Sequence, residues 1–290
     1  FINAGINRFS LGVQSFNNLI LQKSGRRHSK EDAEKSCLWL KRVYDSGLIK
    51  SWSLDLIQNL PFSGFKEWQD DLKKALTFSP PHLSIYDLNI ENGTVFKKLD
   101  DLGKLELPSD KEAFINSQLT HSILKNSGYS RYEISNYSLP RHQSRHNRVY
   151  WSGLGWWSFG QGSTSSPWGE KLTRPRVSKK YKEWVTRQYE VNLDSSLINQ
   201  DFVYQELDEK IMLRLRLKEG LDLYELFKEQ KWDNKKFESS FSKLLEEWER
   251  YLESGLLVRK GNRFFLSDPK GMELSNQIII SMFKWWDEIN

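Results

Sequence analysis

The acidic residue with the clearest chemical significance is Asp55, which lies in an apolar segment between Leu54 and Leu56. A lone carboxylate there costs free energy unless it accepts hydrogen bonds or meets a cation. Asp55 is therefore either a ligand-binding group or a structural acid that accepts a capping hydrogen bond or a salt bridge. Its position in the sequence does not favour one interpretation over the other. Other polar residues follow or end predicted strands: Gln14, Asn89, Glu91 and Glu133. Because the carboxyl ends of parallel strands share one edge of a sheet, we expect these groups to converge on one ligand site.

Composition narrows the chemistry that these residues can perform. The 290 residues include a single cysteine, Cys37, which excludes a disulfide framework and any zinc or iron–sulfur site built from this chain's own thiolates. Lysine and arginine exceed the acidic residues by 43 to 38, an excess too small to imply nucleic-acid binding. No segment approaches the roughly 18–20 apolar residues of a membrane helix, and no signal peptide is visible, so we expect a cytoplasmic protein.

The elements that position the polar groups alternate between strand and helix in the first half of the chain. The predicted strands are residues 8–13, 51–57, 82–88 and 129–134, and the predicted helices are residues 29–46, 65–78 and 110–125. This order indicates βαβ units and a parallel sheet. Since only about four strands are visible, either the sheet is open or N-terminal strands are missing. Residues 1–5 resemble the end of a helix, so we expect the chain to start inside a domain; a trimmed terminus is the alternative.

The second half of the chain has a different organisation. Periodicity fails over residues 135–178, and a loop of that length is usually functional or linking. Charged helices follow, with a short hairpin before the last of them. The predicted helices are residues 201–217, 223–229, 234–255 and 269–286, and the predicted hairpin is residues 255–266. This pattern indicates a small, winged-helix-like domain.

Several motifs, in order along the chain, resemble those of one known family. They are residues 4–16, 25–28, 54–61, 82–86, 91–94, 132–137 and 145–151. Together they resemble the radical S-adenosylmethionine enzymes of the oxygen-independent coproporphyrinogen III oxidase group, over essentially the whole chain. The pattern His146-Asn147-x-x-Tyr150-Trp151 is typical of the HemW branch, whose members act as heme chaperones. The resemblance implies an α/β fold: a partial parallel (βα) barrel in residues 1–165, a linker in 166–200 and a mainly helical, winged-helix-like domain in 201–290.

The resemblance also implies cofactors. The family holds a 4Fe–4S cluster through a Cys-x-x-x-Cys-x-x-Cys motif, which this chain lacks, so we expect the cluster cysteines upstream of Phe1 and no metal ligand within the chain. The positions that match the family's S-adenosylmethionine contacts are Gln14, Arg26, Asp55 and Asn89. Arg26 would pair with the ligand's carboxylate, whereas without the resemblance it is a solvated surface arginine. Residues 58–59, in the turn after the second predicted strand, are Gln-Asn where the family usually has Tyr-Gly. The resemblance therefore does not predict the backbone conformation of this turn.

His146 is the candidate heme ligand that the resemblance suggests. A neutral imidazole is a natural ligand of heme iron, and nearby aromatic rings would stack on a porphyrin: Tyr150, Trp151, Trp156 and Trp157. The alternatives are a histidine hydrogen-bonded in a loop and tryptophans that pack between domains. His142 and His146 have the spacing of a zinc pair on a helix, but Pro140 and the loop composition argue against a helix there.

Three functions remain open from the sequence. The favoured one is a heme-binding chaperone that hands heme to respiratory proteins, with S-adenosylmethionine and the cluster in the complete protein. The alternative is a coproporphyrinogen III oxidase that forms protoporphyrinogen IX in heme biosynthesis; the third is a nonfunctional fragment of either. Whether the protein is an enzyme stays open, although we expect no oxidase activity. The basic stretch 171–182 is a solvated face, or a surface for heme propionates or for peripheral membrane association.

Overall fold

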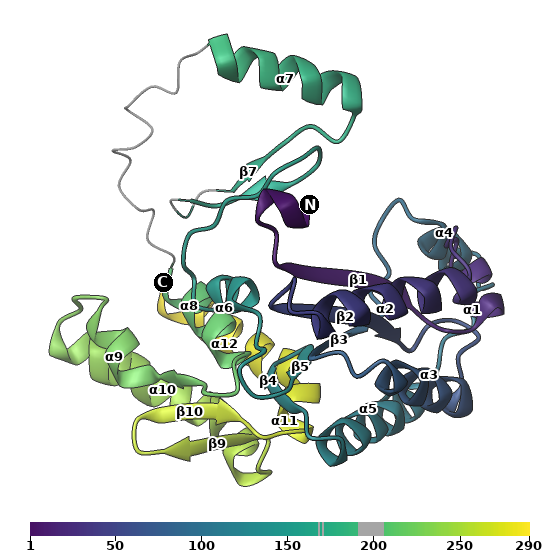
Figure 1. Cartoon of the computed structure of the whole chain (residues 1–290). Coiled ribbons are helices and arrows are strands. Elements are labelled where there is room, and N and C mark those ends of the chain that lie inside the picture. The colour runs from purple at the N-terminus through teal and green to yellow at the C-terminus, as the bar shows by residue number, and fades with distance from the viewer. Residues whose placement is uncertain (168, 170, 191–205) are drawn as a thin grey trace. The chain divides into compact units, whose positions relative to one another are not determined.

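The computed structural model describes residues 1–167, 169, 171–190 and 206–290 (Figure 1). They form two units, one of residues 1–143 with 268–273, the other of residues 144–267 with 274–290. Parts of the predicted linker 166–200 and of the predicted helix 201–217 lie outside the described residues. The domain limits expected from the sequence stay a prediction.

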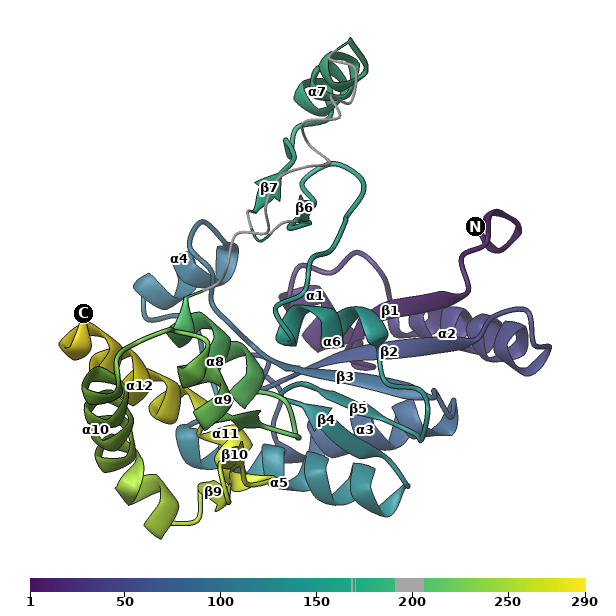
Figure 2. The same cartoon turned by 90° about the vertical axis from the view of Figure 1, so that its left-hand side faces the viewer.

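The first unit is built on a five-stranded sheet of order β1-β2-β3-β5-β4. Its strands are β1 (Arg8–Gln14), β2 (Ser51–Gln58), β3 (His82–Asp87), β4 (Ser130–Glu133) and β5 (Asn136–Ser138). Strands β1, β2 and β3 run parallel and side by side, which confirms the predicted α/β class with a parallel sheet (Figure 2).

One strand of this sheet was not predicted. β5 pairs antiparallel with both β3 and β4, and so it lies between these two strands in the sheet. It is only three residues long and follows β4 after a two-residue turn. A strand that short shows no alternation in the sequence, because its place depends on long-range pairing.

Three long helices cover one face of the sheet: α2 (Lys30–Asp45), α3 (Phe65–Thr77) and α5 (Asp110–Asn126). All three were predicted to within two residues. Ser29 and Ser109 begin α2 and α5 with capping boxes, which satisfy the first free N–H groups of each helix. The short helices were missed: η1 (Ile2–Ala4), α1 (Asn18–Lys23) and α4 (Val95–Asp101).

The core of the first unit lies between these helices and the sheet. Alternate residues of the strands point into it, among them Val13, Trp52, Leu54, Leu56 and Leu83. They meet the apolar sides of the helices, including Cys37 on α2 and Trp68 on α3. Since side chains alternate along a strand, the intervening residues of β1, β2 and β3 point to the opposite face.

The second unit is mainly helical, and its part after residue 206 agrees with the predicted helical C-terminal region. Its elements are α6 (Arg145–Trp151), β6 (Thr164–Ser165), β7 (Leu172–Thr173), α7 (Ser178–Glu190), α8 (Leu207–Leu215), β8 (Leu221–Asp222), α9 (Leu223–Lys228), α10 (Asn234–Glu253), β9 (Leu257–Lys260), β10 (Arg263–Leu266) and α12 (Ser275–Ile289). The predicted hairpin is β9 and β10, and β8 adds a third strand to it. Gly220 allows this addition, because a Cβ there would lie 2.0 Å from the carbonyl oxygen of Phe264.

The predicted last helix, 269–286, is divided in the structure. α11 (Lys270–Glu273) belongs to the first unit, where Glu273 pairs with Arg131 on β4, and α12 starts at Ser275 in the second unit. The ion pair between Glu273 and Arg131 holds the end of α11 in the first unit, and the predicted helix is interrupted directly after it. Among the helices of the described residues, none is both long and apolar enough to span a lipid bilayer.

Candidate functional site

The face of the sheet that the helices leave uncovered is polar. Its side chains come from three parallel strands: Arg8, Ser10, Ser53, Asp55, His82 and Ser84. The strand register places Ser10 beside Ser53, Ser53 beside His82, and Asp55 beside Ser84. Barrel interiors are ordinarily filled by branched apolar residues, so polar side chains on this face favour a polar ligand. Ser53, His82 and Ser84 are buried, so a ligand could reach this face only around Arg8, Ser10 and Asp55.

Asp55 is held on this face by serine hydroxyls. Ser10 donates to both carboxylate oxygens, at 3.0 and 2.9 Å, and Ser53 donates to Oδ1 at 3.0 Å. Burial lowers the pKa of Arg8, and the nearby charges of Tyr132 and Asp55 partly oppose that effect. The Nε and Nη2 atoms of Arg8 are buried without a hydrogen-bond partner. Asp55 is thus a hydrogen-bonded carboxylate on a polar face that can still accept bonds from a ligand.

Behind Asp55 lies a buried chain of hydrogen bonds. The Ser53 hydroxyl lies 2.8 Å from His82 Nδ1, and His82 Nε2 lies 2.8 Å from the Tyr132 hydroxyl. The His82 side chain is fully buried, and this burial lowers its pKa to about 3, so the imidazole is neutral at pH 7. Sequence reasoning did not assign a role to Ser53, His82 or Tyr132. The sequence signal that could have identified Ser53 and His82 is the alternation of polar and apolar residues along β2 and β3.

Gln14 reaches the same face at the carboxyl end of β1. The register of β1 on β2 shifts between Gly12 and Gln14, and Gln14 has a φ of 70°. Its Nε2 lies 2.8 Å from the point where a Cβ of Gly12 would be, and Gly12 is paired with Asp55. The Gln14 side chain therefore lies over Gly12, the residue of β1 that pairs with Asp55.

The loop after Gln14 is fixed by a buried acid on α3. Asp71 accepts hydrogen bonds from Ser15 Oγ at 2.6 Å and from the Phe16 amide at 2.7 Å. Burial raises the pKa of Asp71 to about 6, although these two hydrogen bonds act in the opposite direction. Asp71 thus links the end of β1 to the helical layer, and it was not singled out in the sequence.

Arg26 and Asn89 lie in loops, outside the strands that carry the polar face. Arg26 is exposed in the loop after α1, and Asn89 is exposed beyond the end of β3. Within the part of the chain that the structure describes, no hydrogen bond joins either side chain to Asp55 or Gln14. Their assignment as S-adenosylmethionine contacts stays a prediction. In the turn at residues 58–59, whose backbone the sequence did not predict, Asn59 adopts a φ of 62°. Its side-chain amide donates a hydrogen bond of 2.9 Å to Asp87.

His146 lies in the second unit, on a helix that was not predicted. α6 starts after Ser144, whose hydroxyl accepts from the Asn147 amide and caps the helix. Pro140 and His142 precede it, so the two histidines do not share a helix face. His142 instead contacts Ser51 at 3.1 Å. Consistent with this, no group of three or more His, Cys, Asp or Glu in the described residues could hold a metal ion.

His146 is exposed and lies beside Tyr150, which is half-buried. Its Nε2 lies 2.7 Å from the Tyr150 hydroxyl, and the Tyr150 ring meets Trp156 edge to face at 4.5 Å. Trp157 is 52% exposed nearby in the sequence, whereas Trp151 lies under the guanidinium of Arg216. These side chains offer one imidazole and aromatic rings to a flat ligand. Heme iron bound at Nε2 would displace the Tyr150 hydroxyl.

The iron–sulfur cluster implied by the resemblance does not fit the residues of this chain. Cys37 is buried in the core of the first unit, and burial raises the pKa of its thiol to about 12. A thiolate, which is the form that binds metals, is therefore disfavoured at this position. S-adenosylmethionine does fit, because the polar face supplies a carboxylate and an amide for its hydroxyl and amino groups.

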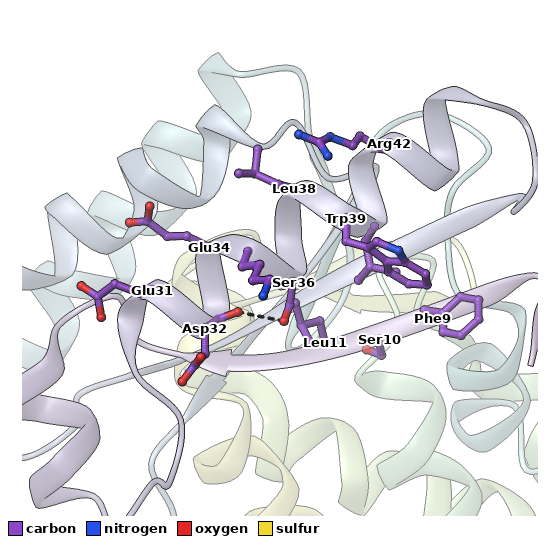
Figure 3. A pocket seen from close by; sticks show the side chains of 12 residues that line it. Phe9, Ser10, Leu11, Glu31, Asp32, Glu34, Ser36, Leu38, Trp39 and Arg42 are labelled. Atoms are coloured by element: carbon purple, nitrogen blue, oxygen red, sulfur yellow. Dashed lines mark hydrogen bonds between the residues drawn. The ribbon is translucent and has the colours of Figure 1, made fainter.

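A groove of about 870 Å³ runs between β1 and α2, and Ser10 is among the residues that line it (Figure 3). Phe9 and Leu11 line it from β1, and Leu38 and Trp39 line it from α2. Trp39 is 54% exposed there. None of the predicted site residues lines this groove.

Comparison with known proteins identifies relatives over nearly the whole chain. The heme chaperone HemW of Synechocystis sp. is 33% identical, in an alignment that covers 99% of this chain and 70% of the relative. HemW of Lactococcus lactis is 31% identical, with 95% and 69% covered. The mitochondrial radical S-adenosyl methionine domain-containing protein 1 of Danio rerio is 27% identical, with 95% and 60% covered.

Structure and domain comparisons agree with these relatives. The coproporphyrinogen III oxidase HemN from Escherichia coli, a radical SAM enzyme, has the same fold with a TM-score of 0.67 at 20% identity. That likeness covers 97% of this chain and 64% of HemN. Residues 205–274 match the HemN C-terminal domain. With these relatives and this fold, the chain belongs to the HemW family.

Proposed function

We propose that this protein is a heme chaperone that binds heme and transfers it to respiratory haemoproteins in the cytoplasm. The observation that carries the proposal is the exposed His146, next to Tyr150 and Trp156 on the surface of the second unit. An imidazole can ligate heme iron, and the neighbouring rings can cover part of a porphyrin face. The relatives named as heme chaperones support this function over that of an oxidase.

Heme titration followed by absorbance tests the proposal. We expect His146→Ala to weaken heme binding and to change the Soret band. His28→Ala is the matched control, because His28 is a histidine of the first unit that bonds to the Val13 carbonyl. An unchanged spectrum and affinity in His146→Ala would remove His146 as the ligand. Conversion of coproporphyrinogen III to protoporphyrinogen would overturn the chaperone function.

S-adenosylmethionine is the second proposed ligand, and it lies on the polar face of the first unit. Asp55 and Gln14 would bind its ribose hydroxyls and amino group, and Arg26 and Asn89 would complete the site from the adjoining loops. When bound near a reduced cluster, this cofactor supplies radical chemistry in related enzymes; for this chain, the proposed role of these residues is binding alone.

Calorimetric titration with S-adenosylmethionine tests this site. We expect Asp55→Asn to lower the affinity by about tenfold, since it replaces a charged acceptor. Asp45→Asn is the control, because Asp45 is an exposed acid paired with Lys41. Equal affinities in the two variants would show that Asp55 does not contact the ligand.

Peripheral membrane association is a further part of the proposal. Phe159 is 87% exposed, and basic residues follow it in the same unit, including Lys171, Lys179 and Lys180. An exposed aromatic side chain and positive charge in the same unit suit an anionic lipid surface. Co-sedimentation with anionic vesicles, but not with neutral ones, would support this association. A Phe159→Ser variant that sediments like the unaltered chain would speak against it.

A further inference from the structure

The hydrogen bonds behind Asp55 have a defined direction. The Ser53 hydroxyl has one proton, and the carboxylate of Asp55 is the strongest acceptor within its reach, at 3.0 Å. Ser53 therefore accepts from His82, which places the proton of the neutral imidazole on Nδ1. His82 Nε2 is then an acceptor, and the Tyr132 hydroxyl donates to it. The donors run in one direction, from Tyr132 through His82 and Ser53 to Asp55.

We propose that Ser53, His82 and Tyr132 are positioning residues that hold the Asp55 carboxylate ready for its ligand. The inference rests on the proposed S-adenosylmethionine site. Aligned hydrogen bonds polarise one another and stabilise negative charge at the accepting end of the chain. Ser10 approaches the same carboxylate from β1, so donors from two strands determine its orientation.

The burial of these residues makes the arrangement rigid. Ser53 and His82 are 0% exposed, and Tyr132 is 1% exposed, so water cannot replace a lost partner. The register also matches this role, because Ser53 is paired with His82 and Asp55 lies two residues further along β2 on the same face. Residues that only filled the core would not need donors that all point toward one carboxylate.

Ligand affinity and stability, measured together on the 290-residue chain, test the proposal. We expect Ser53→Ala to weaken S-adenosylmethionine binding by about tenfold, the effect of one hydrogen bond to a charged group. Tyr132→Phe, at the far end, should weaken it by about threefold. The matched control is Tyr129→Phe, which removes a bond of 2.6 Å from a buried tyrosine to the Pro80 carbonyl. It should lower the melting temperature without changing the affinity.

Two variants of His82 separate positioning from packing. The amide of His82→Asn can still donate near the place of Nδ1, so we expect it to retain most of the affinity. His82→Leu fills similar volume without a donor and should bind as weakly as Ser53→Ala. Equal affinities for the two His82 variants would overturn the proposal, whatever their stability.

Nitrogen-15 NMR of the histidines tests the direction of the bonds without any ligand. We expect His82 to stay in the Nδ1-protonated form from pH 7 down to about pH 4, because burial disfavours its cation. An Nε2-protonated or titrating His82 would contradict the proposal.

The failure of the proposal can be distinguished from failure of the site itself. If Asp55→Asn weakens binding while Ser53→Ala and His82→Leu behave like Tyr129→Phe, the site holds and the positioning role is wrong. If Asp55→Asn leaves the affinity unchanged, both the site and the positioning role are overturned.

Discussion

The two faces of the five-stranded sheet differ in what they contribute. One face packs Trp52, Leu54 and Leu56 of β2 against the helices, and these residues are fully buried. The other face of the same strand carries Ser53 and Asp55, which bond to each other. Because successive residues of a strand point to opposite faces, one short segment serves both stability and binding. Substitutions one residue apart in β2 should therefore have separable effects on stability and on binding.

The largest expected effect on stability comes from Arg131, which lies on the helix-covered side of the sheet. Its side chain is 6% exposed and pairs with Glu273 at 2.6 Å. We expect Arg131→Ala to lower the free energy of unfolding by about 3–5 kcal/mol, because Glu273 loses its buried partner. Urea denaturation measures this. Lys66→Ala, which breaks an exposed pair with Asp70, is the control, and a similar small change in both variants would contradict the expectation.

Leu54→Ala tests the apolar face directly. Leu54 is fully buried, and removing most of its side chain should cost about 2–5 kcal/mol. Leu48→Ala, at a position that is 60% exposed, should cost far less. S-adenosylmethionine affinity should stay unchanged in the folded Leu54 variant. A loss of affinity as large as that of Asp55→Asn would break the distinction between the two faces.

Asp71, which connects the helical layer to the end of β1, gives a pH-dependent effect. Its pKa is about 6 in the folded chain and 3.8 ordinarily, so the folded state binds this proton more tightly than the unfolded state. The free energy of unfolding should therefore fall as the pH rises from about 4 to about 6, by at most about 3 kcal/mol. Asp71→Asn should remove this fall. Urea denaturation across that range measures it, and parallel profiles for the two proteins would contradict the assignment.

Ser10→Ala should have the smallest effect on stability. The hydroxyl is exposed and makes bonds only to Asp55 among the described residues, so its loss should cost about 1 kcal/mol or less. S-adenosylmethionine affinity should nevertheless fall by about threefold, because Asp55 loses one of its two serine donors. Thermal unfolding and calorimetry measure the two quantities. A large loss of stability would show that the polar face also supports the fold.

Much of the fold could be predicted from local patterns. α2 and α5 have Ser–x–x–acid capping boxes and apolar residues at helical spacing, and both were predicted to within two residues. β5 and α6 were missed because neither is long enough to show periodicity. Ser144 caps α6, but it lies in a segment whose glycine, serine and proline content favoured a loop.

Some residues of the candidate site could likewise be predicted from the sequence, and others could not. Asp55 and Gln14 were predicted from their places near strand ends, and Gln14 lies over Gly12, which pairs with Asp55; their role in binding stays a prediction. Ser53 and His82 could not be assigned, because their partners lie up to 50 residues away in the sequence. Arg26, Asn89 and His146 remain predictions that only ligand titrations will test.

The long helices of the first unit, its four longer strands, the family and the carboxylate inside an apolar strand could all be recognised from the sequence. Each of these features depends on helix-capping residues, on the spacing of apolar residues or on motifs, all of which span only a few residues. The place of β5 in the sheet, and the hydroxyls and imidazole that are hydrogen-bonded behind Asp55, emerge only from the folded chain. A hydrogen bond depends on tenths of an ångström between groups far apart in the chain, and that distance exists only once the strands have paired.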